Sequence, residues 1–272
     1  MASIAVSLKG VHAQQQEDIA RVDLSERPQC LIRRHPWEVA RYHFFSRIIE
    51  TWGISIRPSS VLDVGSGDGF FSQQLVYMLA EGSRIVCWDI HYTDADMQVL
   101  TRQSPNSIRY EAAEPDQRFD LVVLLDVLEH VDEDVMFLKR IVDQHMMPGG
   151  MAIISVPAWP ALLSSHDLAL KHCRRYSRRD GFRLVRESGL KPLASGGLFY
   201  SLLLPRIVAK VRERQMNART RRWYSVDRWA AGAFLTRVVL YILNLDCLVS
   251  KLLSRAGLGF PGLSWWAVCR KP

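Results

Sequence analysis

Residues 61–75 read VLDVGSGDGFFSQQL: a short apolar run, an acidic residue, a glycine-rich turn and then apolar residues at helical spacing. This order predicts a β-strand that leads through a tight loop into a helix. Such a loop presents backbone N–H groups to a bound ligand. Its glycines permit positive φ angles and let a ligand approach the backbone closely. The stretch therefore predicts a nucleotide or nucleoside site.

A second strand is predicted over residues 84–90, RIVCWDI, and it ends in Asp89, 24 residues after Gly65. An acid at this place can accept hydrogen bonds from ribose hydroxyls. Its position favours a ligand that carries ribose.

Further apolar runs predict the rest of an α/β fold with a doubly wound, mostly parallel sheet. Strands are expected at 107–111, 119–125, 151–156, 191–200 and 263–269, with helices at 36–52, 132–147 and 177–188. The run at 119–125, FDLVVLL, is almost continuously apolar, as expected of a parallel strand covered on both faces. Strands that alternate with helices indicate right-handed crossovers.

The chain divides into three parts. Residues 1–35 are predicted to be a mobile tail, and residues 36–200 plus 261–272 form the core. Residues 201–260 are an unusually long helical insertion before the last strand, rich in arginine and in aromatic residues. The insertion is expected to act either as a lid over the acceptor or as a surface that faces a membrane.

The net charge of +7 is unevenly placed, because residues 171–228 hold 16 Lys/Arg against 4 Asp/Glu. This excess predicts an anionic partner or a solvated helix surface. Nucleic acid is disfavoured, since no recognised RNA-binding module flanks the core and the insertion is apolar for a solvated groove.

Location is predicted from cysteines and hydropathy. The five cysteines are scattered without metal-type spacing, which indicates reduced thiols in a cytosol. Residues 1–10 do not resemble a signal peptide. Residues 230–249 contain Arg237 and Asp246 and fall short of the ~20 nearly uncharged residues of a spanning helix. A cytoplasmic protein is expected, either free or peripheral at the inner face of a membrane.

Four linked motifs make the sequence resemble the class I S-adenosylmethionine-dependent methyltransferases. They are VLDVGSGDG at 61–69, Asp89, FDLVV at 119–123 leading into DVLEHV at 126–131, and PGG at 148–150. The resemblance covers residues 36–200 and the terminal strand, and it implies six parallel strands with an antiparallel seventh. The competing nicotinamide dinucleotide loop has two residues between its second and third glycines, whereas here Gly67 and Gly69 are separated by one.

Carried over by position, the resemblance implies a site for S-adenosylmethionine. Asp89 would hold the ribose hydroxyls and Ile90 would pack against adenine. The methionine part would be surrounded by Asp63, Gly65, Ser66, Gly67 and Gly69, and Asp126 and Val127 would lie near the reacting centre.

Catalytic candidates follow the fourth and fifth strands. A hydroxyl acceptor benefits from a base, for which we predict His130, His166 and His172, with Tyr176 as a further catalytic residue. Arg174, Arg175 and Tyr200 are predicted to bind substrate. In the alternative interpretation, Arg174, Arg175 and Tyr176 pack the next helix, and Asp167 fixes the loop.

A metal site is a further option, because Glu129, His130, His166 and His172 could supply a ligand set. Spacing does not separate ligands from hydrogen-bond partners, and our prediction assigns no metal.

The function predicted is O-methylation of a small or lipid-like, amphipathic molecule, with peripheral membrane contact through residues 201–260. Alternatives are N- or C-methylation, S-adenosylmethionine-dependent cyclisation of a small metabolite, and a scaffold that binds the cofactor without turnover.

Overall fold

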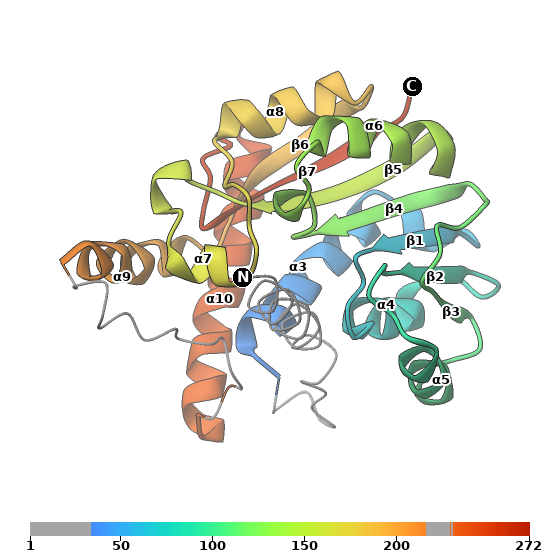
Figure 1. Cartoon of the computed structure of the whole chain (residues 1–272), viewed down its shortest axis with the longest axis horizontal. Helices are drawn as coiled ribbons and strands as arrows, with labels where there is room; N and C mark the ends of the chain where they lie inside the picture. The colour runs from blue at the N-terminus through green and yellow to red at the C-terminus, as the bar shows by residue number, and fades with distance from the viewer. Residues whose placement is uncertain (1–33, 216–228, 230) are drawn as a thin grey trace, which may run out of the picture.

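The computed structural model describes residues 34–215, 229 and 231–272, and they form one seven-stranded sheet covered by helices (Figure 1). The strand order is β3-β2-β1-β4-β5-β7-β6. β7 pairs antiparallel with both of its neighbours, and the other pairs are parallel. The strands are β1 (Ser60–Val64), β2 (Arg84–Trp88), β3 (Ile108–Glu111), β4 (Phe119–Leu125), β5 (Met146–Pro157), β6 (Lys191–Leu198) and β7 (Ser264–Arg270). The predicted doubly wound sheet with its antiparallel last strand is confirmed.

Helices lie on both faces of this sheet. The α-helices are α3 (Pro36–Thr51), α4 (Phe70–Leu75), α5 (Asp94–Gln103), α6 (Asp134–His145), α7 (Ser165–Ala169), α8 (Arg178–Glu187), α9 (Leu203–Gln215) and α10 (Ala233–Arg255). Short 3-10 turns are η2 (Ile54–Ile56), η3 (Val76–Met78), η4 (Leu128–His130), η5 (Pro160–Leu162) and η6 (Tyr200–Leu202). α6 and α8 cover one face, and α3 and α10 cover the other (Figure 1).

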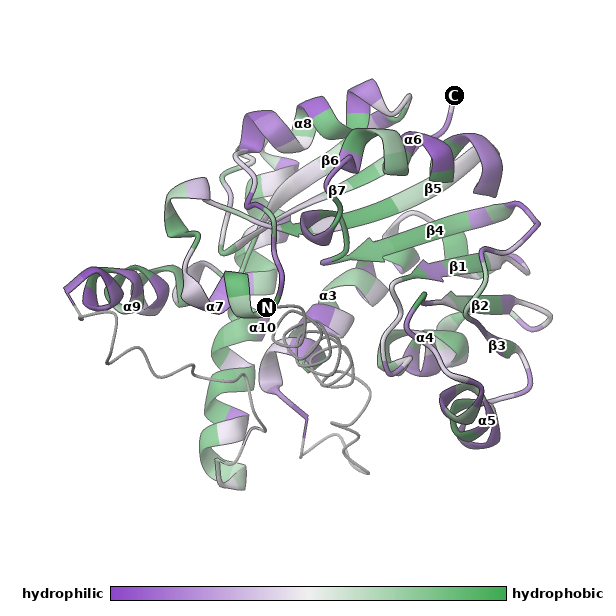
Figure 2. Ribbon diagram, in the orientation of Figure 1, coloured by the Kyte–Doolittle hydropathy of each residue, from purple (hydrophilic) through white to green (hydrophobic). Residues whose placement is uncertain are grey.

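Two hydrophobic cores follow from side chains that alternate along the strands. In β1, Val61 belongs to the core under α3 and α10, whereas Leu62 belongs to the core under α6 and α8. Both residues are fully buried, because a parallel strand inside such a sheet has helices on each side. The strands accordingly form an apolar band through the centre of the molecule (Figure 2).

Local signals place the helix ends. His35 Nδ1 accepts a hydrogen bond from Trp37 N at 3.2 Å, and Pro36 opens α3 as predicted. Ser177 caps α8 in a capping box with Asp180, which confirms its predicted role.

Several predicted boundaries were wrong. β5 begins at Met146, directly after α6, so that the PGG motif lies within the strand rather than before it. β6 ends at Leu198 because Phe199 takes a left-handed φ of 62°. α10 runs to Arg255 and lies within the predicted helical insertion. Within the described residues, α10 is the single helix whose length and composition would allow it to cross a membrane.

Some predictions fall outside the described residues. They concern the mobile tail over residues 1–33, Cys30, and the arginines and aromatic residues between 216 and 228. Cys87, Cys173, Cys247 and Cys269 are free thiols.

Candidate active site

The glycine loop between β1 and α4 takes a backbone conformation that only glycine adopts readily. Gly65, Gly67 and Gly69 have φ angles of 64°, 54° and 72°. A Cβ on Gly65 would lie 2.8 Å from Val127 Cγ2, whereas one on Gly67 would meet no atom within 4 Å. The loop is therefore closed against Val127 on one side and open beside Gly67, where a ligand can reach the backbone.

Two acids flank this loop. Asp63 is buried and accepts a hydrogen bond from Ser72 Oγ at 2.7 Å. Burial raises the pKa of Asp63 to about 7, against the opposing effects of Ser72 and Arg41. Asp89 accepts hydrogen bonds from Gly67 N at 3.1 Å and from His91 N at 2.9 Å, and so ties the end of β2 to the glycine loop.

The surroundings of the loop fit the predicted cofactor. Asp89 stays partly exposed beside Ile90, which is 72% exposed, so that a carboxylate and an apolar surface stand together where ribose and adenine are expected. Tyr92 was missed from the sequence: its hydroxyl donates to Gly67 O at 2.6 Å and lies 2.8 Å from Ser66 Oγ. These contacts hold the loop in shape around the open side of Gly67.

Asp126 ends β4 in a left-handed conformation with a φ of 59°. Its Oδ1 accepts a hydrogen bond from Ser155 Oγ at 3.1 Å, and its Oδ2 lies 2.5 Å from Arg41 Nη1. Arg41 lies on α3, 85 residues away, and no sequence signal marked it. Strained residues of this kind are common at functional sites, where surrounding contacts stabilise them.

A buried acid and two histidines form a cluster directly after β4. Glu129 is fully buried, and neither of its carboxylate oxygens has a hydrogen-bond partner among the described residues. Burial, followed by the nearby Asp126, raises the pKa of Glu129 well above its usual value. His172 Nε2 lies 4.0 Å from Glu129 Oε1, and the rings of His130 and His172 are nearly perpendicular with centroids 4.7 Å apart.

His130 and His172 differ in their electrostatic surroundings. Loss of hydration around the ring, together with the neighbouring His172, lowers the pKa of His130 to about 4, although part of the residue reaches solvent. His130 is therefore neutral at neutral pH. His172 Nδ1 lies 3.2 Å from Asp167 Oδ1, and a proton on Nδ1 leaves Nε2 as an acceptor on the side of Glu129.

Asp167 is the centre of a buried polar network. It accepts hydrogen bonds from Ser164 N and Oγ, from Arg175 Nε, and from Arg206 Nη2 at 2.7 Å. Although burial alone would raise its pKa, the bonds from His172 and Arg175 and the charge of Arg206 hold the pKa of Asp167 well below its usual value. Asp167 is thus a carboxylate that orients His172 and binds α9 through Arg206.

Three predicted functional residues make contacts within the protein, of the kind that the alternative interpretation describes, and their functional roles stay predictions. Tyr176 is buried, and its hydroxyl donates to Asp134 Oδ2 at 2.8 Å and to Leu128 O at 3.0 Å. Arg174 Nη2 donates to Asp132 O at 2.6 Å, and the buried Arg175 binds Asp167 and Ala158 O. These contacts hold Tyr176 and Arg175 in place, whereas the Arg174 side chain remains 37% exposed.

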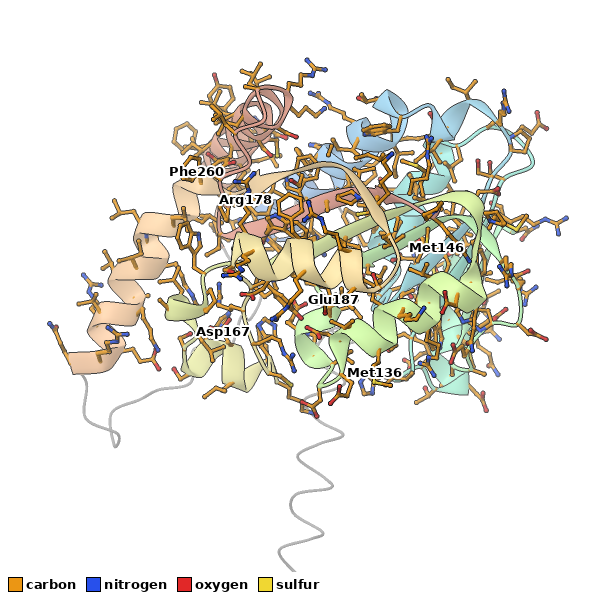
Figure 3. All side chains as sticks on the ribbon, turned by 90° about the horizontal axis from the view of Figure 1, so that it is seen from above. Met136, Met146, Asp167, Arg178, Glu187 and Phe260 are labelled. Atoms are coloured by element: carbon orange, nitrogen blue, oxygen red, sulfur yellow. The ribbon has the colours of Figure 1, made fainter. Side chains whose placement is uncertain are left out.

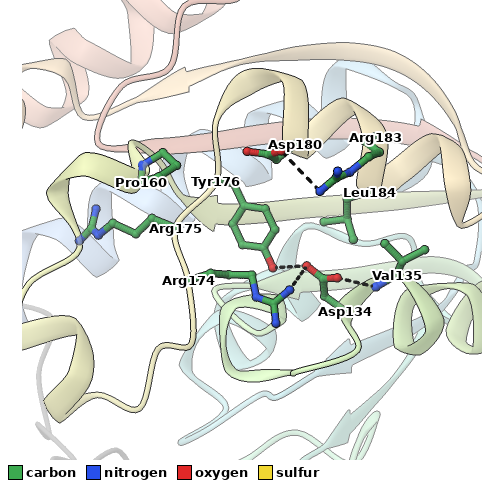
Figure 4. A pocket seen from close by; sticks show the side chains of 9 residues that line it. All are labelled: Asp134, Val135, Pro160, Arg174, Arg175, Tyr176, Asp180, Arg183 and Leu184. Carbon is green, nitrogen blue, oxygen red and sulfur yellow. Dashed lines mark hydrogen bonds and ion pairs between the residues drawn. The ribbon is translucent and has the colours of Figure 1, made fainter.

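The same three residues line a pocket of about 300 Å³ on the α6 and α8 side of the sheet (Figure 4). Arg174 and Tyr176 converge there on Asp134, whereas Arg175 points away (Figure 4). The pocket is separate from the glycine loop in its lining. Within it, Arg174 pairs with Asp134 and Arg183 pairs with Asp180.

Two further predicted site residues, His166 and Tyr200, lie in the segments that follow β5 and β6. His166 lies on α7 beside Asp167, and its catalytic role stays a prediction. Tyr200 lies in η6, and its hydroxyl donates to Phe260 O at 3.0 Å, which joins the beginning of the insertion to its end.

Comparisons with known proteins agree with this geometry. A family model described as a methyltransferase domain matches residues 37–195. The chain is similar to the ubiquinone biosynthesis O-methyltransferases of Azorhizobium caulinodans, 33% identical over 111 residues (37% of this chain, 42% of the relative), and of Rickettsia typhi, 32% over 101 residues (35% and 39%). The matched stretch thus spans about two fifths of these curated relatives.

Among solved structures, the chain resembles a protein from Galdieria sulphuraria assigned as a sarcosine dimethylglycine methyltransferase. The TM-score is 0.54 at 16% identity, and the alignment covers 86% of each chain. This likeness shows the fold. With the family match over more than half of the chain, it establishes that the chain belongs to the methyltransferase-domain family and is an S-adenosylmethionine-dependent enzyme of the class I fold.

Proposed function

We propose that this enzyme O-methylates a small or amphipathic molecule, with a histidine of the His130 and His172 pair as the base. The observation that carries the proposal is the pair itself. It follows Asp126 at the carboxyl edge of the sheet, where ligands of open α/β folds bind. His130 is neutral at neutral pH, and Asp167 orients His172.

Methyl transfer requires only a few contributions from the residues of this chain. S-adenosylmethionine, when bound, supplies an electrophilic methyl group. The residues must align the acceptor and exclude water, which contributes strongly to in-line displacement. They must also take the hydroxyl proton: an imidazole nitrogen accepts it as the acceptor oxygen becomes a nucleophile. A neutral imidazole can do this, whereas a protonated one cannot.

Two further observations support an oxygen acceptor. The curated relatives are named O-methyltransferases of ubiquinone biosynthesis, although the similarity covers only part of them. The base pair would add little for an amine acceptor that has already lost its proton. N-methylation, C-methylation and cyclisation are the alternative reactions that the product analysis distinguishes from O-methylation.

A divalent cation at the same cluster is a second candidate, favoured by the unpartnered carboxylate of Glu129. Glu129, His130 and His172 each offer one ligand atom, and these atoms lie within 4.8 Å of one another. A cation there would lower the pKa of an acceptor hydroxyl and would leave Glu129 ionised. Our sequence prediction assigned no metal, so dialysis against a chelator, followed by readdition of Mg²⁺, Mn²⁺ or Zn²⁺, decides between the two forms of the proposal.

The test uses the purified full chain with S-adenosylmethionine and a panel of phenols, amines and enolisable acceptors. We expect methylated phenols, identified by mass and by the O-methyl signal in NMR spectra. His130→Asn and His172→Asn should each lower kcat by about 10²-fold or more while S-adenosylhomocysteine affinity is kept. His43→Asn is the matched control, because His43 lies on α3 and contacts Asn244 of α10. Methylated amines, or full turnover in both active-site variants, would contradict the proposal.

A further inference from the structure

Helix α10 turns three polar side chains inward, beside the buried Leu243 and Cys247. Thr236, Asp246 and Ser250 are buried, although they are the groups that a surface helix normally exposes. Asp246 Oδ2 accepts hydrogen bonds from Ser201 N at 3.0 Å and from Ser201 Oγ at 2.6 Å. Ser250 Oγ accepts one from Trp266 Nε1 of β7 at 2.9 Å. The inner face of α10 is therefore held by polar contacts with Ser201 of η6 and Trp266 of β7, and by Leu243 and Cys247 in the hydrophobic core.

The outer face of α10 is apolar and exposed. Phe234 is 82% exposed and Tyr241 is 73% exposed. They belong to a stripe that recurs every three or four residues, namely Phe234, Val238, Tyr241, Leu245, Leu248 and Leu252. The helix extends away from the sheet, and its surface is apolar along most of its length (Figures 1 and 2).

Helix α9 also has polar contacts on its inner side and apolar residues on its exposed side. Its Arg206 binds Ser164 Oγ and Asp167, and its Glu213 accepts a hydrogen bond from Ser165 N at 2.8 Å. Its exposed side carries Leu204, Ile207 and Val211. α9 projects from the body of the molecule with side chains free on its outer side (Figure 3).

The charged side chains of α9 and α10 favour binding to an anionic surface. Asp246 and Glu213 are their only acids, and both accept hydrogen bonds from the protein. The exposed charges are basic: Arg212, Arg214, Arg237 and Arg255. An apolar face bordered by arginines binds an anionic lipid surface, where buried apolar area and electrostatic attraction add together.

We propose that the outer faces of α9 and α10 dock the enzyme onto an anionic phospholipid bilayer, from which an amphipathic acceptor enters the site. The second clause rests on the proposed function, and the docking does not. α10 lies in the plane of the bilayer interface rather than across it, because spanning would break the contacts of Asp246 with Ser201 and of Ser250 with Trp266. A second copy fits less well, since it would bring two basic faces together.

The test is vesicle flotation of the full chain without acceptor or cofactor, so that failure of the O-methylation proposal does not affect it. Vesicles contain phosphatidylcholine alone or with about a third phosphatidylglycerol. We expect strong binding to the anionic vesicles. The double variant Leu245→Gln/Leu248→Gln should weaken it about tenfold or more. Arg237→Gln/Arg255→Gln should weaken it by about fivefold per charge on anionic vesicles only.

Ile56→Gln/Met136→Gln is the control, because these apolar side chains lie on other elements and are at least as exposed as Leu245 and Leu248. It should bind vesicles as the unmodified chain does. Unchanged melting temperature and S-adenosylhomocysteine affinity show that each variant is folded. Absence of vesicle binding, or equal binding by the leucine variant, would overturn the proposal. So would a dimer in lipid-free solution that the leucine substitutions dissociate, since a second copy would then cover this face.

Discussion

Arg206 Nη2 lies 2.7 Å from Asp167 Oδ2, and this contact joins the insertion to the active site. The other carboxylate oxygen of Asp167 orients His172, the proposed base. Asp167 therefore links His172 to α9, the helix that carries Arg206 and an exposed apolar face. The proposed docking surface and the proposed base are thereby connected through one buried carboxylate.

Arg206 is expected to act as a positioning residue. Arg206→Ala should lower kcat by about tenfold, with S-adenosylhomocysteine affinity unchanged, because His172 loses part of the network that orients it. The pH profile of kcat should shift as well, since Asp167 loses a neighbouring positive charge. Lys210→Ala is the control, because Lys210 pairs with Glu213 on the same helix. An equal fall in the control variant would assign the effect to α9 in general.

Asp63 is expected to make cofactor affinity depend on pH. Its pKa is raised to about 7 by burial, so the carboxylate ionises as the pH rises from 6 to 8. An ionised carboxylate favours the ammonium group of the ligand. S-adenosylhomocysteine should therefore bind more tightly to the native chain than to Asp63→Asn, and the difference should grow across this range. Isothermal titration of both proteins cancels the ligand's own titration, and parallel curves would contradict the prediction.

His130 is expected to reduce stability at acidic pH. Its pKa is about 4 in the folded chain and 6.5 as a free side chain, so the unfolded chain binds the proton first as the pH falls. The stabilising contribution is complete above pH 6.5 and is lost as the pH falls through 4. Melting temperatures measured between pH 7.5 and 4.5 should fall less for His130→Asn than for the native chain. The reverse order would show that His130 gains rather than loses basicity on folding.

Gly181 is expected to be required for the close packing of α8 against Trp265. A Cβ there would lie 2.7 Å from Trp265 Cε3, and Trp265 is fully buried between α8 and the sheet. Gly181→Ala should cost about 1–3 kcal/mol of unfolding free energy in urea titrations, because the indole must shift in a close-packed core. Gly232→Ala is the matched control, since its Cβ meets no atom within 4 Å. Similar losses in the two variants would rule out overpacking as the cause.

Much of the fold and the cofactor half of the site could be predicted from sequence, because their signals are local. The glycine loop and the acid at the end of β2 each follow a strand along the chain, and parallel topology brings strand ends together. The acceptor half could not be predicted in the same way. Arg206 meets Asp167 from 39 residues away, and no periodicity marks either partner for the other.

Helix α10 of the insertion shows most clearly what the sequence could not predict. The sequence by itself indicated helical apolar spacing across the insertion, with apolar residues in excess between 230 and 249. It did not determine which face turns inward. Only the tertiary structure decided that, because Trp266 and Ser201 present polar groups to Ser250 and Asp246. Leu243 and Cys247 of that face pack in the hydrophobic core. Asp246 and Ser250 can be buried beside them because each is hydrogen-bonded there, and Leu245 and Leu248 remain exposed on the other side.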